Sequence, residues 1–265
     1  MIEEFIDFGS WQSIALFTAI NFGVIFFRYV MVSLIFHFVF KVILKNRYES
    51  RRISDKLRKP KQSQKEILWS AITSFIFTLS FVGMVWLYLN GKTAIYTNVS
   101  EYGWWYLPIS LLIAMLIHEA YYYFLHRWMH RPKIFKLFHY VHHDSVVTSP
   151  WTSFSFHPIE SILQALIIPF IILFLPMHFG VIFFMLILMT VTATINHLHI
   201  EIYPKGFAKN WFGKWWIGSS HHSLHHSKYR FNYGLYFTFM DSVFKTESPE
   251  YLPLFEEKTT SKTTA

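Results

Sequence analysis

The chain reads WWYLPISLLIAMLIHEAYYYFLHRWMH from Trp104 to His130. Its apolar part, Trp104 to Leu125, is long enough for a membrane-spanning helix, which needs about 20 apolar residues. The run continues directly into His126 and His130, whose separation of four places both imidazoles on one helix face, about one turn apart. The stretch therefore predicts a helix that crosses a membrane and carries metal-binding side chains where it leaves the membrane.

Other apolar segments extend this prediction to most of the chain. Trp11 to Leu44 and Ile67 to Leu89 also reach spanning length. Two shorter runs, Ile162 to Leu175 and Phe179 to Ile195, are separated by Pro176 and predict a hydrophobic hairpin, either two short spans or a re-entrant pair. The predicted fold is all-α: a multi-pass transmembrane helix bundle of three long spans plus a hairpin, with a cytosolic helical cap that holds a dimetal site.

The composition agrees with a membrane as the solvent. Hydrophobic residues make up 53% of the chain, aromatic residues 20% and charged residues only 15%, which leaves too few polar groups to cover a soluble globule. The chain has no cysteine, which excludes disulfides, thiolate metal sites, iron–sulfur clusters and a covalently attached haem. Nitrogen and oxygen must therefore hold any metal.

The excess positive charge is confined to one loop. Lys41 to Lys65 holds ten Lys and Arg against two acidic residues, and the other charges of the chain cancel. A basic loop beside an apolar segment indicates the cytosolic side of a membrane and argues against a nucleic-acid surface. This orientation puts the N-terminus outside and both histidine-rich regions in the cytosol.

Twelve of the fifteen histidines fall in two short regions, 118–143 and 197–226. Adjacent residues on a helix diverge by about 100°, so neighbouring imidazoles can serve different ions. The eight predicted ligands are His126, His130, His139, His142, His143, His222, His225 and His226. Eight imidazoles indicate two metal ions, since a mononuclear zinc site uses three or four protein ligands. Imidazole suits iron, zinc, copper and nickel alike, so spacing alone does not choose the metal.

These motifs resemble those of the membrane fatty acid hydroxylase and sterol desaturase superfamily, whose pattern is HRxxH followed by two copies of HxxHH. The match runs from about Glu119 to Thr246, and Ser220 to His226 is especially similar to the third motif of the alkylglycerol monooxygenase branch. Some positions depart from the pattern: Glu119 stands for a common Asp, Met240 for a Trp and Lys245 for a Gly. None of them is a predicted ligand, so they bear on the branch and not on the chemistry.

The resemblance implies two iron ions as cofactors, O₂ as co-substrate, and hydroxylation or desaturation of a C–H bond of a membrane lipid, whether a sterol, a fatty acyl or an alkyl lipid. No catalytic side chain is expected beyond the metal centre. An external electron donor of the cytochrome b5 or ferredoxin type is expected as a partner. Such a protein would be integral to a bacterial inner membrane or the endoplasmic reticulum.

The resemblance also suggests residues around the eight ligands. His199 stands where the family often places a further ligand, and His197 is a weaker candidate because it points elsewhere on a helix. Hydrogen-bond partners that orient the ligand imidazoles are predicted at Glu119, Asp144, His157, Asn232 and Asp241. Structural roles are expected for His37, His178 and His221, and His118 is expected to be hydrogen bonded within the membrane or to line a substrate channel.

The chain is expected to divide into three parts. Residues 1–100 hold the N-terminal transmembrane helices and the basic loop, 101–250 the hydroxylase or desaturase domain with its histidine motifs, and 251–265 a polar tail. Arg28 lies in the middle of the first apolar segment, where an unpaired charge is costly. A helix break or a side chain that reaches for the membrane surface is preferred there to a functional role.

Two other functions are open to a histidine-rich membrane protein. A zinc-dependent intramembrane hydrolase would need HExxH, but Tyr122 stands where the second histidine should follow His118. A metal transporter would place its ligands at bilayer depth within spanning helices, whereas these motifs lie just beyond the apolar runs. An oxidoreductase agrees with the motifs better than either alternative.

Overall fold

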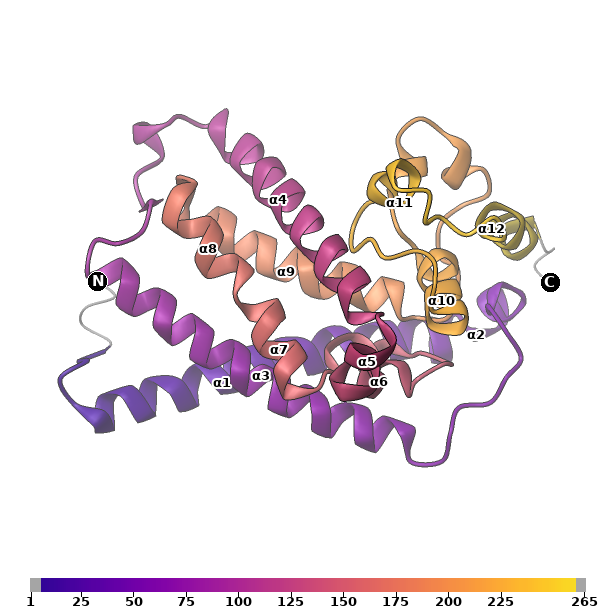
Figure 1. The fold of residues 1–265 in the computed structure, drawn as a ribbon, viewed down its shortest axis with the longest axis horizontal. Helices are drawn as coiled ribbons and strands as arrows, with labels where there is room; N and C mark the ends of the chain where they lie inside the picture. Colours follow the sequence, from indigo (N-terminus) through magenta and orange to yellow (C-terminus); the bar gives the residue numbers. More distant parts are fainter. Residues whose placement is uncertain (1–5, 261–265) are drawn as a thin grey trace.

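Four long apolar helices form the body of the protein, which the computed structural model describes for residues 6–260 (Figure 1). They are α1 (Trp11–Phe38), which continues as the π-helix η2 (Val39–Ile43), α3 (Gln62–Leu89), α4 (Tyr106–Met129) and α9 (Phe179–Asn196). Each is long and apolar enough to cross a membrane. The predicted all-α, multi-pass fold is confirmed, and the protein is a membrane protein.

The other elements are short. The α-helices are α2 (Lys45–Tyr48), α5 (Pro132–Ile134), α6 (Tyr140–His143), α7 (Pro158–Ala165), α8 (Ile167–Phe174), α10 (Ser219–Lys228), α11 (Phe239–Val243) and α12 (Tyr251–Thr260). The π- and 3-10 helices are η3 (Glu49–Arg51), η4 (Val99–Glu101), η5 (Phe135–His139), η6 (Pro150–Phe154), η7 (Phe207–Lys209) and η8 (Gly213–Trp215). Strand β1 (Ile95–Tyr96) pairs in parallel with β2 (Met177–His178) and ties the loop before α4 to the turn before α9.

The predicted hairpin consists of a short broken helix followed by one full span. Helices α7 and α8 cover residues 158–174, and α9 alone has 18 residues. The chain leaves α8 in an extended conformation at Leu175, and the His178 side chain caps α9 by accepting a hydrogen bond from the Gly180 N–H (3.1 Å). Ile171 of α8 and Met185 of α9 share one buried apolar cluster with Met115 of α4, so the hairpin packs against the third span.

The helices are apolar outside and carry small polar side chains inside. On α1, Leu16, Ile20 and Val24 are each more than half exposed, whereas Ser70 and Thr73 of α3 are fully buried. The Thr73 hydroxyl is hydrogen bonded to that of Ser161 on α7 (2.8 Å). This polarity suits a lipid solvent, in which polar groups must find partners within the protein.

The basic loop folds back onto the segment that follows the second histidine motif. Glu66, buried near the start of α3, accepts hydrogen bonds from Arg58 (2.5 Å) and from the hydroxyls of Ser145 (2.8 Å) and Thr152 (2.8 Å). The Ile53 N–H donates to the carbonyl of His199 (3.1 Å). The loop therefore helps to position both histidine-rich regions.

Helices α10, α11 and α12 gather into a cap at one end of the bundle, beyond the ends of α4 and α9 (Figure 1). Tyr251 and Phe255 of α12 share a buried cluster with Leu224 of α10. The segment predicted as a polar tail therefore begins with a packed helix through Thr260, because its two aromatic rings recur at a helical spacing of four. Residues 261–265 of that tail lie outside the described part of the chain.

Candidate metal centre

The three histidine motifs meet at the C-terminal end of α4. His126 lies in the last turn of α4 and His130 is the residue that ends this helix. The second motif begins in the π-helix η5 and continues into α6, and the third lies in α10. Elements from distant parts of the sequence thus bring their imidazoles to one region.

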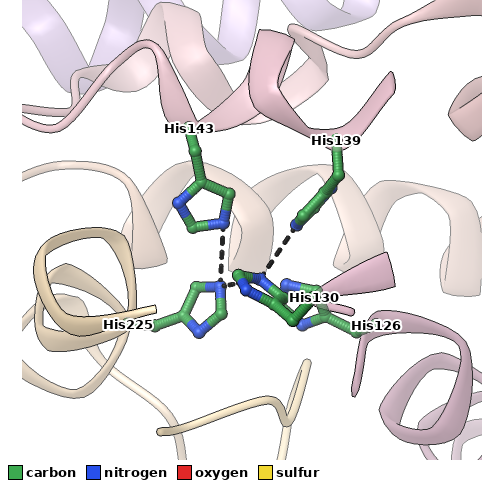
Figure 2. Close-up of side chains that lie close together, drawn as sticks. All are labelled: His126, His130, His139, His143 and His225. Carbon is green, nitrogen blue, oxygen red and sulfur yellow. Dashed lines mark hydrogen bonds between the residues drawn. The ribbon is translucent and has the colours of Figure 1, made fainter. Parts of the chain in front are cut away.

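Five imidazoles form the first group, which we call the five-histidine group (Figure 2). Its members are His126, His130, His139, His143 and His225. One nitrogen of each lies within 4.8 Å of the corresponding nitrogen of every other member. The Nε2 atom of His130 is 3.1 Å from that of His139 and 3.1 Å from that of His225. The imidazoles therefore converge through the same type of nitrogen.

Four imidazoles form the second group, the four-histidine group. Its members are His142, His197, His222 and His226, all of them buried. The Nε2 atom of His197 lies 3.2 Å from that of His142 and 3.0 Å from that of His222. The chain separates neighbours between the groups, since His142 and His143, and likewise His225 and His226, point to different ones.

Both groups fit a metal ion. Two nitrogens that each lie about 2.1 Å from one ion are about 3.0 Å apart at octahedral angles and about 3.4 Å apart at tetrahedral angles. The Nε2 separations of 3.0–3.2 Å fall in that range. The buried Nε2 of His126 has no hydrogen-bond partner among the described residues, as expected of an atom that an ion would satisfy.

Hydrogen bonds to the other ring nitrogen fix which imidazole atom is free. The Nδ1 atoms of His126, His225 and His197 lie 2.9, 2.7 and 2.7 Å from the carbonyl oxygens of Tyr233, Phe231 and Ala193. A carbonyl oxygen can only accept, so each Nδ1 carries the proton and donates it. The Nε2 lone pairs are left free to bind metal.

Burial keeps these imidazoles neutral. It lowers the pKa of His139, His142, His143, His222, His225 and His226 well below the usual value, and the neighbouring imidazoles lower it further. Only a neutral imidazole offers a lone pair to a metal. The buried surroundings therefore hold these histidines in the protonation state that metal binding requires.

His199 and His197 are placed differently from the sequence prediction. The structure does not bring His199 to either group: its imidazole lies 3.0 Å from the Ser54 hydroxyl and 3.4 Å from that of Ser223. Helix α9 ends at Asn196, and the backbone at His199 has a φ of 60°, so a helical projection does not apply beyond the helix end. His197, the weaker candidate of the prediction, belongs to the four-histidine group.

A carboxylate that the prediction passed over contacts the five-histidine group. Glu160, fully buried in α7, lies with Oε1 2.9 Å from Nδ1 of His139. The predicted partners Asp144 and His157 do not take this role: Asp144 pairs at the surface with Lys59 (2.5 Å), and His157 accepts the Ile159 N–H (3.3 Å) as the cap of α7. The signal for Glu160 in the sequence was its acidic side chain two residues after the pair His157-Pro158, at the start of a largely apolar segment.

The other three predicted partners act on the backbone instead of on an imidazole. Glu119 of α4 accepts from the N–H groups of residues 235–237, the shortest bond being 2.7 Å to Tyr236. Asp241 accepts from the N–H groups of residues 233 and 234, at 2.8 and 2.9 Å. Asn232 donates to the carbonyl of His221 (2.8 Å). Together they hold the loop whose carbonyls accept from His126 and His225.

Gly234 shows how tightly this loop is packed. A Cβ at that position would lie 2.5 Å from the carbonyl oxygen of Phe237 and 3.0 Å from Glu119 Oε1. Burial raises the pKa of Asp241 to about 6, although the hydrogen bonds from Gly234, Thr246 and Tyr233 work in the opposite direction. The loop is therefore a crowded support for the metal-facing histidines.

A cavity adjoins the four-histidine group. His197 and His222 line it, together with apolar side chains that include Phe77, Phe154 and Met189. Arg28 of α1 also lines the cavity, so the charged residue of the first span lies near the metal-binding region. A largely apolar space beside a metal centre suits a lipid or another apolar substrate.

Comparison with known proteins gives the same assignment. Residues 111–246 match the family model of the fatty acid hydroxylases. A Δ7-sterol 5(6)-desaturase of Gibberella zeae is 27% identical over 248 residues, covering 92% of this chain and 73% of that protein. Human lathosterol oxidase is 27% identical over 238 residues, 88% of this chain and 74% of its own length.

A plant relative matches a shorter part of the chain. The Δ7-sterol-C5(6)-desaturase of Nicotiana tabacum is 32% identical over 163 residues, which is 59% of this chain and 56% of that protein. No solved structure matches the chain significantly. The family match covers the three histidine motifs and the loop that supports them, and the chain therefore belongs to the fatty acid hydroxylase family and is a membrane oxidoreductase.

Proposed function

We propose that the protein is an O₂-dependent di-iron enzyme that forms a double bond between two carbons of a membrane lipid. Hydroxylation of one of these carbons is the related reaction. One observation carries the proposal: two groups of imidazoles converge through Nε2 beside an apolar cavity. The five-histidine group would hold one iron and the four-histidine group the other. Bound iron would supply the redox chemistry that activates O₂ toward an unactivated C–H bond.

The stoichiometry requires electrons from elsewhere. Desaturation converts CH–CH and O₂, with two electrons and two protons, into C=C and two waters; hydroxylation converts C–H and O₂, with the same electrons and protons, into C–OH and one water. A donor of the cytochrome b5 or ferredoxin type would supply them. Exposed Lys133 and Lys136 near the motifs would offer positive charge to an acidic donor on the cytosolic side. Lys228 is also exposed there, but it is paired with Glu250 (3.0 Å).

The chain's own residues would orient the ligand imidazoles and exclude water from the site. The backbone carbonyls at Tyr233, Phe231 and Ala193 hold imidazoles in one tautomer, and the apolar cavity wall keeps water from the lipid. The relatives' names support a sterol-like lipid as the substrate class and desaturation as the outcome. The proposed ligands are the eight motif histidines and His197 in place of His199.

The two alternative functions receive less support from the site. Glu119 accepts hydrogen bonds from three backbone N–H groups, so it is not free to act as the base of a zinc hydrolase, and His118 belongs to neither histidine group. A transporter would need ligands along the spans, whereas both groups lie where α4 and α9 end.

Product analysis tests the proposal. The protein is expressed in cells that accumulate a Δ7-sterol, and membrane lipids are compared by mass spectrometry with and without O₂. We expect a new lipid that has lost two hydrogens or gained one oxygen, absent from cells with His225→Ala and present with His37→Ala, a histidine outside both groups. An unchanged lipid profile with an intact, iron-loaded protein would contradict the proposal.

A further inference from the structure

Arg28 is a charged residue within the first membrane-spanning helix. It lies well inside α1, with more than one helical turn of apolar sequence on its N-terminal side and ten residues of α1 on its C-terminal side. A charge at such a depth costs free energy unless a partner or a water-filled space compensates it. Its place in the structure therefore calls for a partner.

Residues 6–260, the part of the chain that the structure describes, do not provide that partner. The Nε atom of Arg28 is buried and has no hydrogen bond, and none of the ion pairs among residues 6–260 includes Arg28. The neighbouring residue Tyr29, by contrast, is fixed by a hydrogen bond from its hydroxyl to the carbonyl of Trp151 (2.9 Å). Helix α1 is thus held in place at Tyr29, whereas the guanidinium of Arg28, the preceding residue, has no acceptor among the described residues.

Arg28 borders the cavity that adjoins the four-histidine group. Arg28 lines this cavity together with His197 and His222, and no Asp or Glu is among its lining residues. The side-chain acceptor Oδ1 of Asn196, also in the cavity wall, has no hydrogen-bond partner either. An unpaired donor and an unpaired acceptor in one cavity indicate that a polar group of a ligand belongs there. A hydroxyl could pair with both atoms, whereas an ionised oxygen could pair with Arg28 only.

Charge favours an anionic ligand over a neutral one. All-imidazole ligation would leave the two bound ions uncompensated by any protein carboxylate within the groups. Arg28 adds a further positive charge to the same cavity, in surroundings that are otherwise largely apolar. A buried cation is best compensated by a buried anion that is also hydrogen bonded to it.

We propose that Arg28 is a specificity-determining residue that binds an acceptor oxygen at the polar end of the lipid substrate, an ionised oxygen in preference to a hydroxyl. The guanidinium would set which carbons of the lipid lie beside the four-histidine group. This assignment deepens the proposed function and rests on it for the identity of the cavity as the lipid site. It also distinguishes Arg28 from the apolar residues of the cavity, which would recognise the lipid only by shape.

Equilibrium binding tests the assignment without turnover. The iron-loaded protein in non-ionic detergent is titrated with two lipid series, a sterol in 3-deoxy, 3-hydroxy and 3-sulfate forms, and octadecene, oleyl alcohol and oleate, by displacement of a fluorescent lipid. Hydrogen bonds to a charged group are worth about a factor of ten or more in affinity. The wild type should therefore favour the oxygen-bearing lipid over the bare hydrocarbon by about tenfold, and the ionised form further, in at least one series.

The variants separate the guanidinium from general effects on the helix. Arg28→Gln should lose the preference to within about twofold, and Arg28→Lys should keep part of it, since lysine retains the charge without the fork of donors. Arg47→Gln, the same change at an exposed site in the basic loop, should leave it unchanged. An unaltered preference in Arg28→Gln would overturn the assignment, and so would a wild type that does not distinguish the lipids or binds none of them.

Failure of this inference and failure of the proposed function give different results. If the protein binds ionised lipids through Arg28 but forms no oxidised product, the role of Arg28 stands and the proposed function fails. If product forms and the binding preference is unchanged in Arg28→Gln, the proposed function stands and the role of Arg28 fails. Should Arg28→Gln not fold, judged by thermal unfolding and iron content, the Arg28→Lys variant and the wild-type preference decide the question.

Discussion

The two histidine groups differ in how the protein supports them. In the five-histidine group, His139 contacts the buried carboxylate of Glu160, and His126 and His225 donate to backbone carbonyls. In the four-histidine group, His142 and His197 have carbonyl partners, whereas Nδ1 of His222 and of His226 has none. Nδ1 of His143 in the first group has no partner either, so the buried carboxylate of Glu160 is what distinguishes the support of the five-histidine group.

The groups also differ in what they face. Two members of the four-histidine group, His197 and His222, line the cavity, whereas none of the five-histidine group does. The difference suggests unequal roles for the two proposed ions. Five imidazoles, one of them supported by a carboxylate, would hold one ion, and four imidazoles would hold the other, closer to the substrate. The predictions below test this asymmetry, beginning with the largest effects.

Removing one ligand from either group should cost one ion and nearly all activity. We expect His225→Ala and His222→Ala each to reduce the metal content from about two ions to about one and activity by more than about a hundredfold, since loss of a mere ligand partner already costs about 10–100-fold. Metal analysis of the purified variants measures this. Full metal content in both variants would show that the groups do not bind the ions.

A comparison of His197 with His199 tests which histidines belong to the four-histidine group. His197→Ala should lose the ion of the four-histidine group, whereas His199→Ala should retain both ions and lose only about 1 kcal/mol of folding free energy through its bonds to Ser54 and Ser223. Metal content and thermal unfolding distinguish the two. Equal metal loss in both variants would count against the division of ligands drawn from the structure.

Glu160→Gln should weaken the five-histidine group alone. We expect its metal affinity to fall by about 10–100-fold, because the carboxylate no longer orients and polarises His139. Asp144→Asn is the matched control: its pair with Lys59 is at the surface, so affinity should not change. Chelator competition measures the metal affinity of both variants. An equal loss of affinity from the two groups in Glu160→Gln would contradict the difference drawn between them.

Acid should destabilise the metal-free protein through histidines outside both groups as well as within them. Burial lowers the pKa of His221 and of His199 from 6.5 to about 3. Between these values the unfolded chain binds protons that the folded chain does not, so stability is full above about pH 6.5 and falls as pH drops toward 3, by up to about 1.4 kcal/mol per pH unit for each histidine. Thermal unfolding across this range measures the slope, which should be shallower in His199→Ala.

Sequence reasoning placed the spans and the motif histidines because both follow from local periodicity. The apolar runs became α1, α3, α4 and α9, and the structure brings together all eight motif histidines. It could not place His197, because the projection assumed that the helix continues, whereas α9 ends at Asn196. Nor could it choose Glu160 over Asp144, since that depends on how α7 packs against η5 and not on spacing.

The most direct test of the account is metal analysis of the detergent-purified, full-length protein combined with Mössbauer spectroscopy after enrichment with ⁵⁷Fe. We expect about two iron ions per chain, one per histidine group, with two inequivalent and magnetically coupled signals. A single zinc ion per chain, or two uncoupled irons of which neither is lost in His225→Ala, would contradict it.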